Sequence, residues 1–106
     1  YELAKPGALL EEIDRQVRQV LINAGYESRI LHRTGHGLGI TGHEAPFLAL
    51  GDRRRLLPGM IISIEPGLYI HGQGGYRHSD TVLVTETGCL RLSDAPDTLE
   101  ELNIAL

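Results

Sequence analysis

The first regular pattern in the chain is a set of apolar residues at helical spacing. These residues recur at steps of three and four positions, the period of an amphipathic helix: Leu10, Ile13, Val17, Val20, Leu21 and Ala24. Acidic residues fall in the first turns, where they complement the positive end of the helix dipole: Glu11, Glu12 and Asp14. Gly25 follows as a natural stop. The pattern predicts one helix over about residues 8–24.

The segment after this helix predicts a strand that leads into a loop. Residues 26–34 are interpreted as the strand. Four glycines then punctuate a loop that Pro46 closes, because glycine and proline interrupt regular structure: Gly35, Gly37, Gly39 and Gly42.

Further strands follow the polar loop at residues 51–56. Residues 60–65 are near-continuously apolar and rich in β-branched side chains, which predicts a buried strand that resumes at 68–70. The two-residue period of a strand separates its side chains into two faces, one with Ile61, Ser63 and Glu65 and the other with Met60, Ile62 and Ile64.

The last third of the chain completes an α+β pattern. Residues 81–85 predict a strand, and a turn at 86–88 leads it into residues 89–92. Residues 96–101 predict a short terminal helix. One main helix followed by several strands predicts an α+β fold in which the helix packs on a mostly antiparallel sheet.

Composition narrows the class of protein. The 106 residues suffice for one domain. The net charge of −4 does not favour nucleic acid, and Arg53 to Arg55 are expected to form a solvated loop. No apolar run approaches the length that spans a bilayer, so no membrane partner is expected. A single cysteine, Cys89, excludes an intramolecular disulfide and fits a reducing compartment, so we expect the cytoplasm.

Candidate chemistry gathers around the glycine-rich segment. His32, His36 and His43 lie within twelve residues of one another, and imidazole is both the commonest metal ligand and the usual acid or base near neutral pH. A structural role in packing is the alternative for each of them. Glu65 ends an apolar run and would need a metal ion or a cation such as Arg77 if it is buried. The alternative is an exposed strand end before Pro66.

Four sequence blocks resemble the pita-bread metallopeptidases. They occur here in the order of Xaa-Pro dipeptidases and Xaa-Pro aminopeptidases, and the resemblance extends from Lys5 to Gly88; the blocks are His36-Gly37-Leu38-Gly39, His43-Glu44-Ala45-Pro46, Ser63-Ile64-Glu65-Pro66-Gly67-Leu68-Tyr69 and Thr81-Val82-Leu83-Val84-Thr85-Glu86-Thr87-Gly88. The resemblance implies half of a pseudo-twofold pita-bread fold. Residues 1–106 would be the C-terminal part of the catalytic domain of a hydrolase that cleaves an amide bond next to proline.

The resemblance also implies a role for each site residue. His36 would bind a divalent metal (Mn, Co or Zn), and Glu65 would ligate metal and manage the protons of the nucleophile. His43 would stabilise the tetrahedral intermediate and the leaving group. His32 and Arg77 would shape a pocket for a peptide or small amide substrate.

Two departures from the family pattern bear on these roles. The family's metal pair also needs two aspartates from an earlier hairpin, and the only aspartate before His36 is Asp14, in the predicted helix. The resemblance therefore implies that the half of the metal site with the two aspartates is missing from residues 1–106. The second departure is Ser79, which stands where a bridging glutamate is expected and cannot bridge two cations as a carboxylate does. His78 is adjacent, but neighbours in a strand point to opposite faces.

Two alternatives remain open beside the peptidase. Ser79 favours the creatinase-like hydrolases, which cleave a C–N bond without metal, whereas His43-Glu44-Ala45-Pro46 favours the peptidases. The other alternative is a non-catalytic module that binds peptides or proteins. We expect residues 1–106 alone to be inactive and to hold no tightly bound metal. Because one helix covers only one face of the sheet, we also expect a homodimer.

Overall fold

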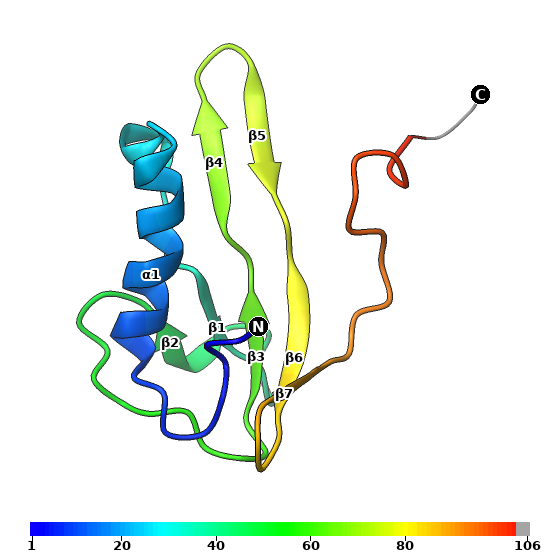
Figure 1. Cartoon of the computed structure of the whole chain (residues 1–106). Coiled ribbons are helices and arrows are strands. Elements are labelled where there is room, and N and C mark those ends of the chain that lie inside the picture. The colour runs from blue at the N-terminus through cyan, green and yellow to red at the C-terminus, as the bar shows by residue number, and fades with distance from the viewer. Residues whose placement is uncertain (104–106) are drawn as a thin grey trace.

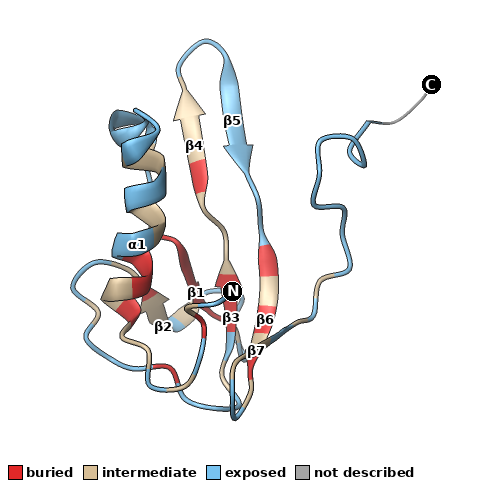
Figure 2. Ribbon diagram, viewed as in Figure 1, coloured by how far each residue is buried: buried red, intermediate tan, exposed pale blue. Residues whose placement is uncertain are grey.

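The predicted helix forms over Leu10–Asn23 (α1) in the computed structural model, which describes residues 1–103. Gly25 ends it with a φ of +86°, a left-handed conformation that costs glycine little. Leu10 and Ile13 are buried, but Val20 on the same apolar stripe is 69% exposed. Figure 2 shows the same gradient, with buried residues confined to the first turns of α1. Only the first half of the helix therefore packs on the sheet.

Every strand pairing in the structure is antiparallel, which confirms the α+β prediction. A five-stranded sheet has the order β2-β1-β3-β6-β7, and a separate pair joins β4 to β5 (Figure 1). A 3₁₀ turn at Glu27–Arg29 links the helix to the sheet. The strands are β1 (Gly35–Gly37), β2 (Glu44–Leu48), β3 (Ile61–Ile64), β4 (Gly67–Ile70), β5 (Gly74–Arg77), β6 (Asp80–Val84) and β7 (Cys89–Arg91).

Strands β3 and β4 form one long ribbon with β5 and β6, as Figure 1 shows. Ile64 pairs with Asp80 at the end of one ladder, and Gly67 pairs with Arg77 at the start of the next, so the register is unchanged across the gap. The backbone N–H of His78 donates to the carbonyl of Pro66 within the gap, at 3.2 Å. The residues between the two ladders are therefore also cross-strand partners.

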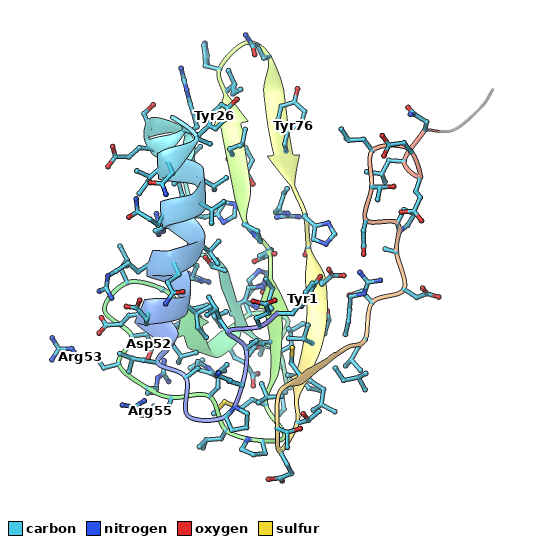
Figure 3. All side chains as sticks on the ribbon, in the orientation of Figure 1. Tyr1, Tyr26, Asp52, Arg53, Arg55 and Tyr76 are labelled. Carbon is cyan, nitrogen blue, oxygen red and sulfur yellow. The ribbon has the colours of Figure 1, made fainter. Side chains whose placement is uncertain are left out.

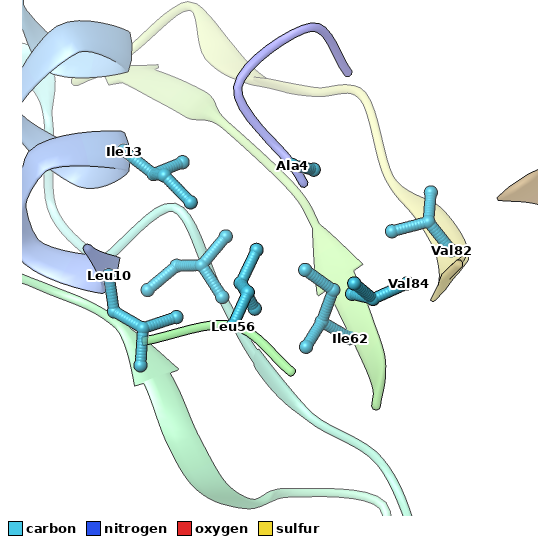
Figure 4. Close-up of a cluster of buried hydrophobic side chains, with 8 residues drawn as sticks. Ala4, Leu10, Ile13, Leu56, Ile62, Val82 and Val84 are labelled. Atoms are coloured by element: carbon cyan, nitrogen blue, oxygen red, sulfur yellow. The ribbon is translucent and has the colours of Figure 1, made fainter. Parts of the chain in front are cut away.

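The hydrophobic core lies on the face of the sheet that α1 covers (Figure 4). It consists of Ala4, Leu10, Ile13, Leu48, Leu56, Ile62, Val82 and Val84, with Met60 and Ile64 packed against it. Each large apolar side chain that becomes fully buried contributes roughly 1.5–3 kcal/mol. The predicted division of β3 into two faces is confirmed, because Met60, Ile62 and Ile64 all contact the core.

The opposite side of the sheet carries no helix in the described part of the chain. We call it the open face and define it by His36, Phe47, Ile61 and Ser63. His36 pairs directly with Phe47 across β1 and β2, and paired residues share a face. Because Leu48 and Ile62 belong to the core, their strand neighbours Phe47, Ile61 and Ser63 project to the other side.

The predicted strand at residues 26–34 is wrong, and the loop predicted for the glycines after it is confirmed only for Gly39 and Gly42. The only regular element at 26–34 is the 3₁₀ turn at Glu27–Arg29. Gly35–Gly37 is instead a buried strand inside the sheet. A Cβ on Gly35 would lie 1.9 Å from the Ser63 carbonyl oxygen, so this glycine allows close packing. Pro46 does not close a loop but lies in edge strand β2, where a missing N–H is tolerated.

Two further differences concern the ends of the later strands. The resumed strand at 68–70 is confirmed as β4, but its partner β5 was not predicted, because its glycines suggest a turn. The predicted helix at 96–101 is wrong: Leu102 N–H bonds to the Thr98 carbonyl in a single turn. Leu99 is 79% exposed, so no buried apolar face supports a longer helix.

The remaining strands and the arginine loop follow the sequence predictions. Strands β6 and β7 form where residues 81–85 and 89–92 predict them. Arg53 and Arg55 are exposed (Figure 3), and Arg54 pairs with Asp52 at 2.5 Å. No helix in residues 1–103 has the length and apolar character that crossing a bilayer requires.

Candidate active site

His36 is held rigidly in the middle of the sheet. It lies on β1 and is 4% exposed, and its backbone N–H donates to the Ser63 hydroxyl at 3.0 Å. Its Nδ1 lies 3.0 Å from the Gly37 carbonyl oxygen. A carbonyl only accepts hydrogen bonds, so Nδ1 carries the proton and Nε2 is left to face the site. Metal-binding histidines commonly have this arrangement.

Glu65 faces that free nitrogen directly after β3. Its Oε1 lies 3.1 Å from His36 Nε2, and its backbone N–H donates to the Thr34 carbonyl at 2.7 Å. A neutral imidazole nitrogen and a carboxylate oxygen both present lone pairs, so this contact needs a proton or a cation between the two atoms. The suggested partner Arg77 does not fill this role, because it is exposed on β5.

His43 completes the group from the loop between β1 and β2. Its ring centroid lies 4.0 Å from that of His36, at 31° between the ring planes. Glu44 orders this loop by accepting hydrogen bonds from the N–H and hydroxyl of Thr41, and these bonds lower the pKa of Glu44. A Cβ on Gly39 would lie 2.1 Å from the Glu44 carboxylate, so a side chain at this position would require Glu44 to shift.

Together these side chains form a compact donor set. One donor atom from each of His36, His43 and Glu65 lies within 4.8 Å of the others. The imidazole of His36 and the carboxylate of Glu65 suit a divalent transition metal such as zinc, and the His43 imidazole lies within reach of the same position. The residues present therefore fit a divalent ion, although they supply only one carboxylate.

Ser79 lies on the open face beside Glu65. The unbroken register of the long ribbon makes Glu65 and Ser79 cross-strand partners. Its neighbour His78 is directed elsewhere: its Nε2 lies 2.6 Å from an oxygen of Asp80, which is buried on the core face. His78, Asp80 and Asp97 form a second group of donors within 4.8 Å, which the sequence analysis did not identify.

His32 connects the site strand to the ribbon. Its Nδ1 lies 2.7 Å from the Arg33 carbonyl and therefore carries the proton, so Nε2 accepts from the Tyr69 hydroxyl at 2.8 Å. Tyr69 lies on β4, and Arg77 lies opposite Gly67 on β5. Neither His32 nor Arg77 belongs to the donor set around His36.

Asp14 supports the site, although the sequence analysis assigned it only to the helix dipole. One carboxylate oxygen accepts from the N–H and hydroxyl of Thr34, at 2.8 and 2.7 Å. The other accepts from Arg18 Nε at 2.8 Å and from the N–H of Leu50 at 3.0 Å. Asp14 thus fixes the start of the strand that carries His36. Its position beside Ile13 on the apolar stripe of the helix is a signal that could have identified it.

Comparison with known proteins places this geometry in a family. The profile of metallopeptidase family M24 matches residues 1–86. The probable dipeptidase PepE of Mycobacterium tuberculosis is 42% identical over 99 residues, which is 93% of this chain and 26% of that protein. The Xaa-Pro dipeptidase of Pyrococcus furiosus is 45% identical over 92 residues, covering 87% of this chain and 26% of its own length.

Solved structures agree with these relatives. The prolidase from Pyrococcus horikoshii OT3 superposes with a TM-score of 0.90 at 41% identity, over 92% of this chain and 28% of that chain. This likeness confirms that the α+β architecture is part of a pita-bread fold. The chain spans about a quarter of the length of the curated relatives it matches. It belongs to metallopeptidase family M24.

Proposed function

We propose that residues 1–106 are the C-terminal part of the catalytic domain of a hydrolase that cleaves the amide bond next to proline. The observation that carries this proposal is the convergence of His36, His43 and Glu65 on the open face. Relatives named Xaa-Pro dipeptidase support the substrate class. The rest of the catalytic domain would come from the full-length protein.

His36 and Glu65 would hold a divalent ion, for which Mn, Co and Zn are the candidates. When bound, the ion supplies Lewis-acid chemistry that activates water and polarises the amide carbonyl. Glu65 takes a proton from the attacking water, since its carboxylate lies within 4.8 Å of the donor nitrogens of His36 and His43. His43 donates a hydrogen bond to the oxyanion and a proton to the leaving amine. Its loop position leaves it accessible to substrate.

His32 and Arg77 are proposed to shape the substrate pocket. His32 accepts a hydrogen bond from the Tyr69 hydroxyl at 2.8 Å and so connects the segment before β1 to β4. Arg77, on the neighbouring strand, adds an exposed positive charge. A peptide or small amide is the proposed substrate, and the free thiol of Cys89 is compatible with the proposed cytoplasmic location.

A creatinase-like hydrolase that needs no metal is the second candidate. Ser79 beside Glu65 supports it, because the ribbon then offers one carboxylate where two would hold a metal pair. The direct 3.1 Å contact between His36 and Glu65 also suits an acid–base pair. On either reading, we propose that residues 1–106 alone are inactive and bind no metal pair, because His36 and Glu65 supply too few ligands.

Hydrolysis by the full-length protein tests these functions. Xaa-Pro dipeptides are assayed against Xaa-Ala dipeptides after metal removal, with and without Mn²⁺, Co²⁺ or Zn²⁺. Metal-dependent cleavage that prefers proline supports the peptidase. Cleavage of amide substrates that survives metal removal supports the creatinase-like alternative. Peptide binding without turnover would contradict both and indicate a binding module.

Variants test the assigned roles in the same assay. His43→Ala and Glu65→Gln are each expected to lower kcat about 100-fold or more, with a smaller change in KM. His78→Ala is the matched control, because His78 pairs with Asp80 instead of the donor set. An equal loss for His78→Ala and His43→Ala would contradict the assignment.

A further inference from the structure

Arg33 is a half-buried cation that lacks an acidic partner. Three arginines are half-buried in residues 1–103. Arg18 pairs with Asp14 at 2.8 Å, and Arg91 pairs with Asp97 at 2.6 Å. No carboxylate lies within ion-pair distance of Arg33, and its Nε is shielded from solvent without a hydrogen-bond acceptor in the described chain. Buried N–H groups are nearly always hydrogen-bonded, so the Arg33 Nε is suited to bind an acceptor from a ligand.

The Arg33 guanidinium packs on Phe47, a residue of the open face. Its central carbon is 4.5 Å from the centroid of the Phe47 ring. Phe47 is the direct cross-strand partner of His36. The guanidinium therefore packs on the residue that pairs with His36 across the two strands. Contact with the ring holds the guanidinium in place while leaving its positive charge without a counter-ion in residues 1–103.

A carboxylate is the acceptor that best fits a fixed guanidinium. The planar fork of arginine binds both carboxylate oxygens at once, and removal from bulk water strengthens the contact. A dipeptide carries a free carboxylate one residue beyond the bond to be cleaved. Arg77, the arginine expected to shape the substrate pocket, is exposed on β5, so water can hydrate it without a ligand.

We propose that Arg33 binds the C-terminal carboxylate of the substrate and so selects dipeptides over longer or amidated peptides. This proposal rests on the proposed hydrolase function. It assigns Arg33 to substrate recognition, with Phe47 holding the guanidinium in place. The reacting groups remain His36, His43 and Glu65.

Paired substrates test the proposal in the full-length protein. An Xaa-Pro dipeptide is compared with its C-terminal amide in wild type, Arg33→Met and Arg33→Lys. Methionine keeps apolar contact with Phe47, and lysine keeps the charge without the fork. Arg33→Met is expected to raise KM for the free acid about tenfold or more and to change KM for the amide less than twofold. Arg33→Lys should give a KM for the free acid between those of wild type and Arg33→Met. Arg29→Met replaces an exposed arginine and should leave both KM values unchanged.

An equal loss on both substrates would overturn the proposal, because it would show that Arg33 only supports the fold. If wild type hydrolyses neither substrate, the proposed function fails separately. In that case, calorimetry measures the affinities of the same two peptides for wild type and Arg33→Met, and these affinities test the role of Arg33. Preference for the free acid that disappears in Arg33→Met supports the proposal, and equal affinities for acid and amide in wild type overturn it.

Discussion

Glu65 and Ser79 lie directly opposite each other in the ribbon formed by β3–β4 and β5–β6. A carboxylate at position 79 would therefore stand beside the Glu65 carboxylate on the open face. In the full-length protein, Ser79→Glu is expected to increase the number of divalent ions retained per chain, as measured by mass spectrometry of the metal content after dialysis. Serine offers only a hydroxyl, whereas glutamate can bridge two ions.

Tyr76→Glu is the matched control for this experiment, since it adds the same charge at an exposed position of the same ribbon. Tyr76 lies outside both donor groups, so its replacement should leave the metal content unchanged. A similar gain from both variants would indicate a general effect of charge and contradict the cross-strand arrangement.

Replacing the buried carboxylate of Asp14 should destabilise the fold strongly. Asp14→Ala would leave the N–H groups of Thr34 and Leu50 and the Arg18 guanidinium without their acceptor. The expected loss is about 3 kcal/mol of unfolding free energy, measured by urea denaturation. Glu12→Ala removes an exposed carboxylate of the same helix and should change little. Equal stability of the two variants would show that the Asp14 network carries no net energy.

A side chain at position 35 should destabilise the sheet. The added Cβ of Gly35→Ala would overlap the Ser63 carbonyl, and the backbone of β1 or β3 would have to move. Overpacking of this kind costs about 3 kcal/mol or more when backbone must shift. Gly88→Ala meets no atom within 4 Å and serves as the control in the same thermal unfolding measurement. Tolerance of Gly35→Ala would mean that β1 and β3 lie farther apart than described.

Asp80 should make the fold sensitive to acid. Burial raises the pKa of this carboxyl, but hydrogen bonds from Tyr1 and His78 outweigh burial and hold the pKa below its usual 3.8. A lowered folded-state pKa stabilises the protein above the unfolded-state pKa, and this contribution is lost as the pH falls through the folded-state value. The stability difference between wild type and Asp80→Asn should therefore be constant above about pH 5 and shrink below about pH 4. A difference independent of pH would contradict this account.

Residues 1–106 alone should self-associate through the open face. Ile61, Leu83 and Leu90 form a cross-strand row on that face, and Leu90 is 55% exposed. An uncovered apolar row of this kind favours a second layer, and a twofold dimer supplies it. Sedimentation at micromolar concentration should show a dimer that Leu90→Lys weakens and Leu99→Lys does not. A well-folded monomer would contradict the prediction.

The sequence pattern identifies the reactive residues of the site but not the residues that hold them in position. His36 and Glu65 were identifiable because histidine beside glycines and a carboxylate in an apolar run are unusual, and period two placed Glu65 on the correct face of β3. Asp14 was missed because its partners, Thr34 and Leu50, are distant in sequence. Gly35 was read as flexible because its packing against Ser63 depends on a neighbouring strand that local pattern does not reveal.

Neighbouring residues of β3 lie on opposite faces of the sheet, so their substitution affects different properties of the protein. Along β3, Ile62 contacts the core while Ser63 contacts His36 from the other side. Substitution of Ile62 is therefore expected to lower stability first, and substitution of Ser63 to displace His36 first. A relative can lose reactivity through the second kind of substitution and still keep the fold. Stability and reactivity therefore depend on different, neighbouring residues of the same strand.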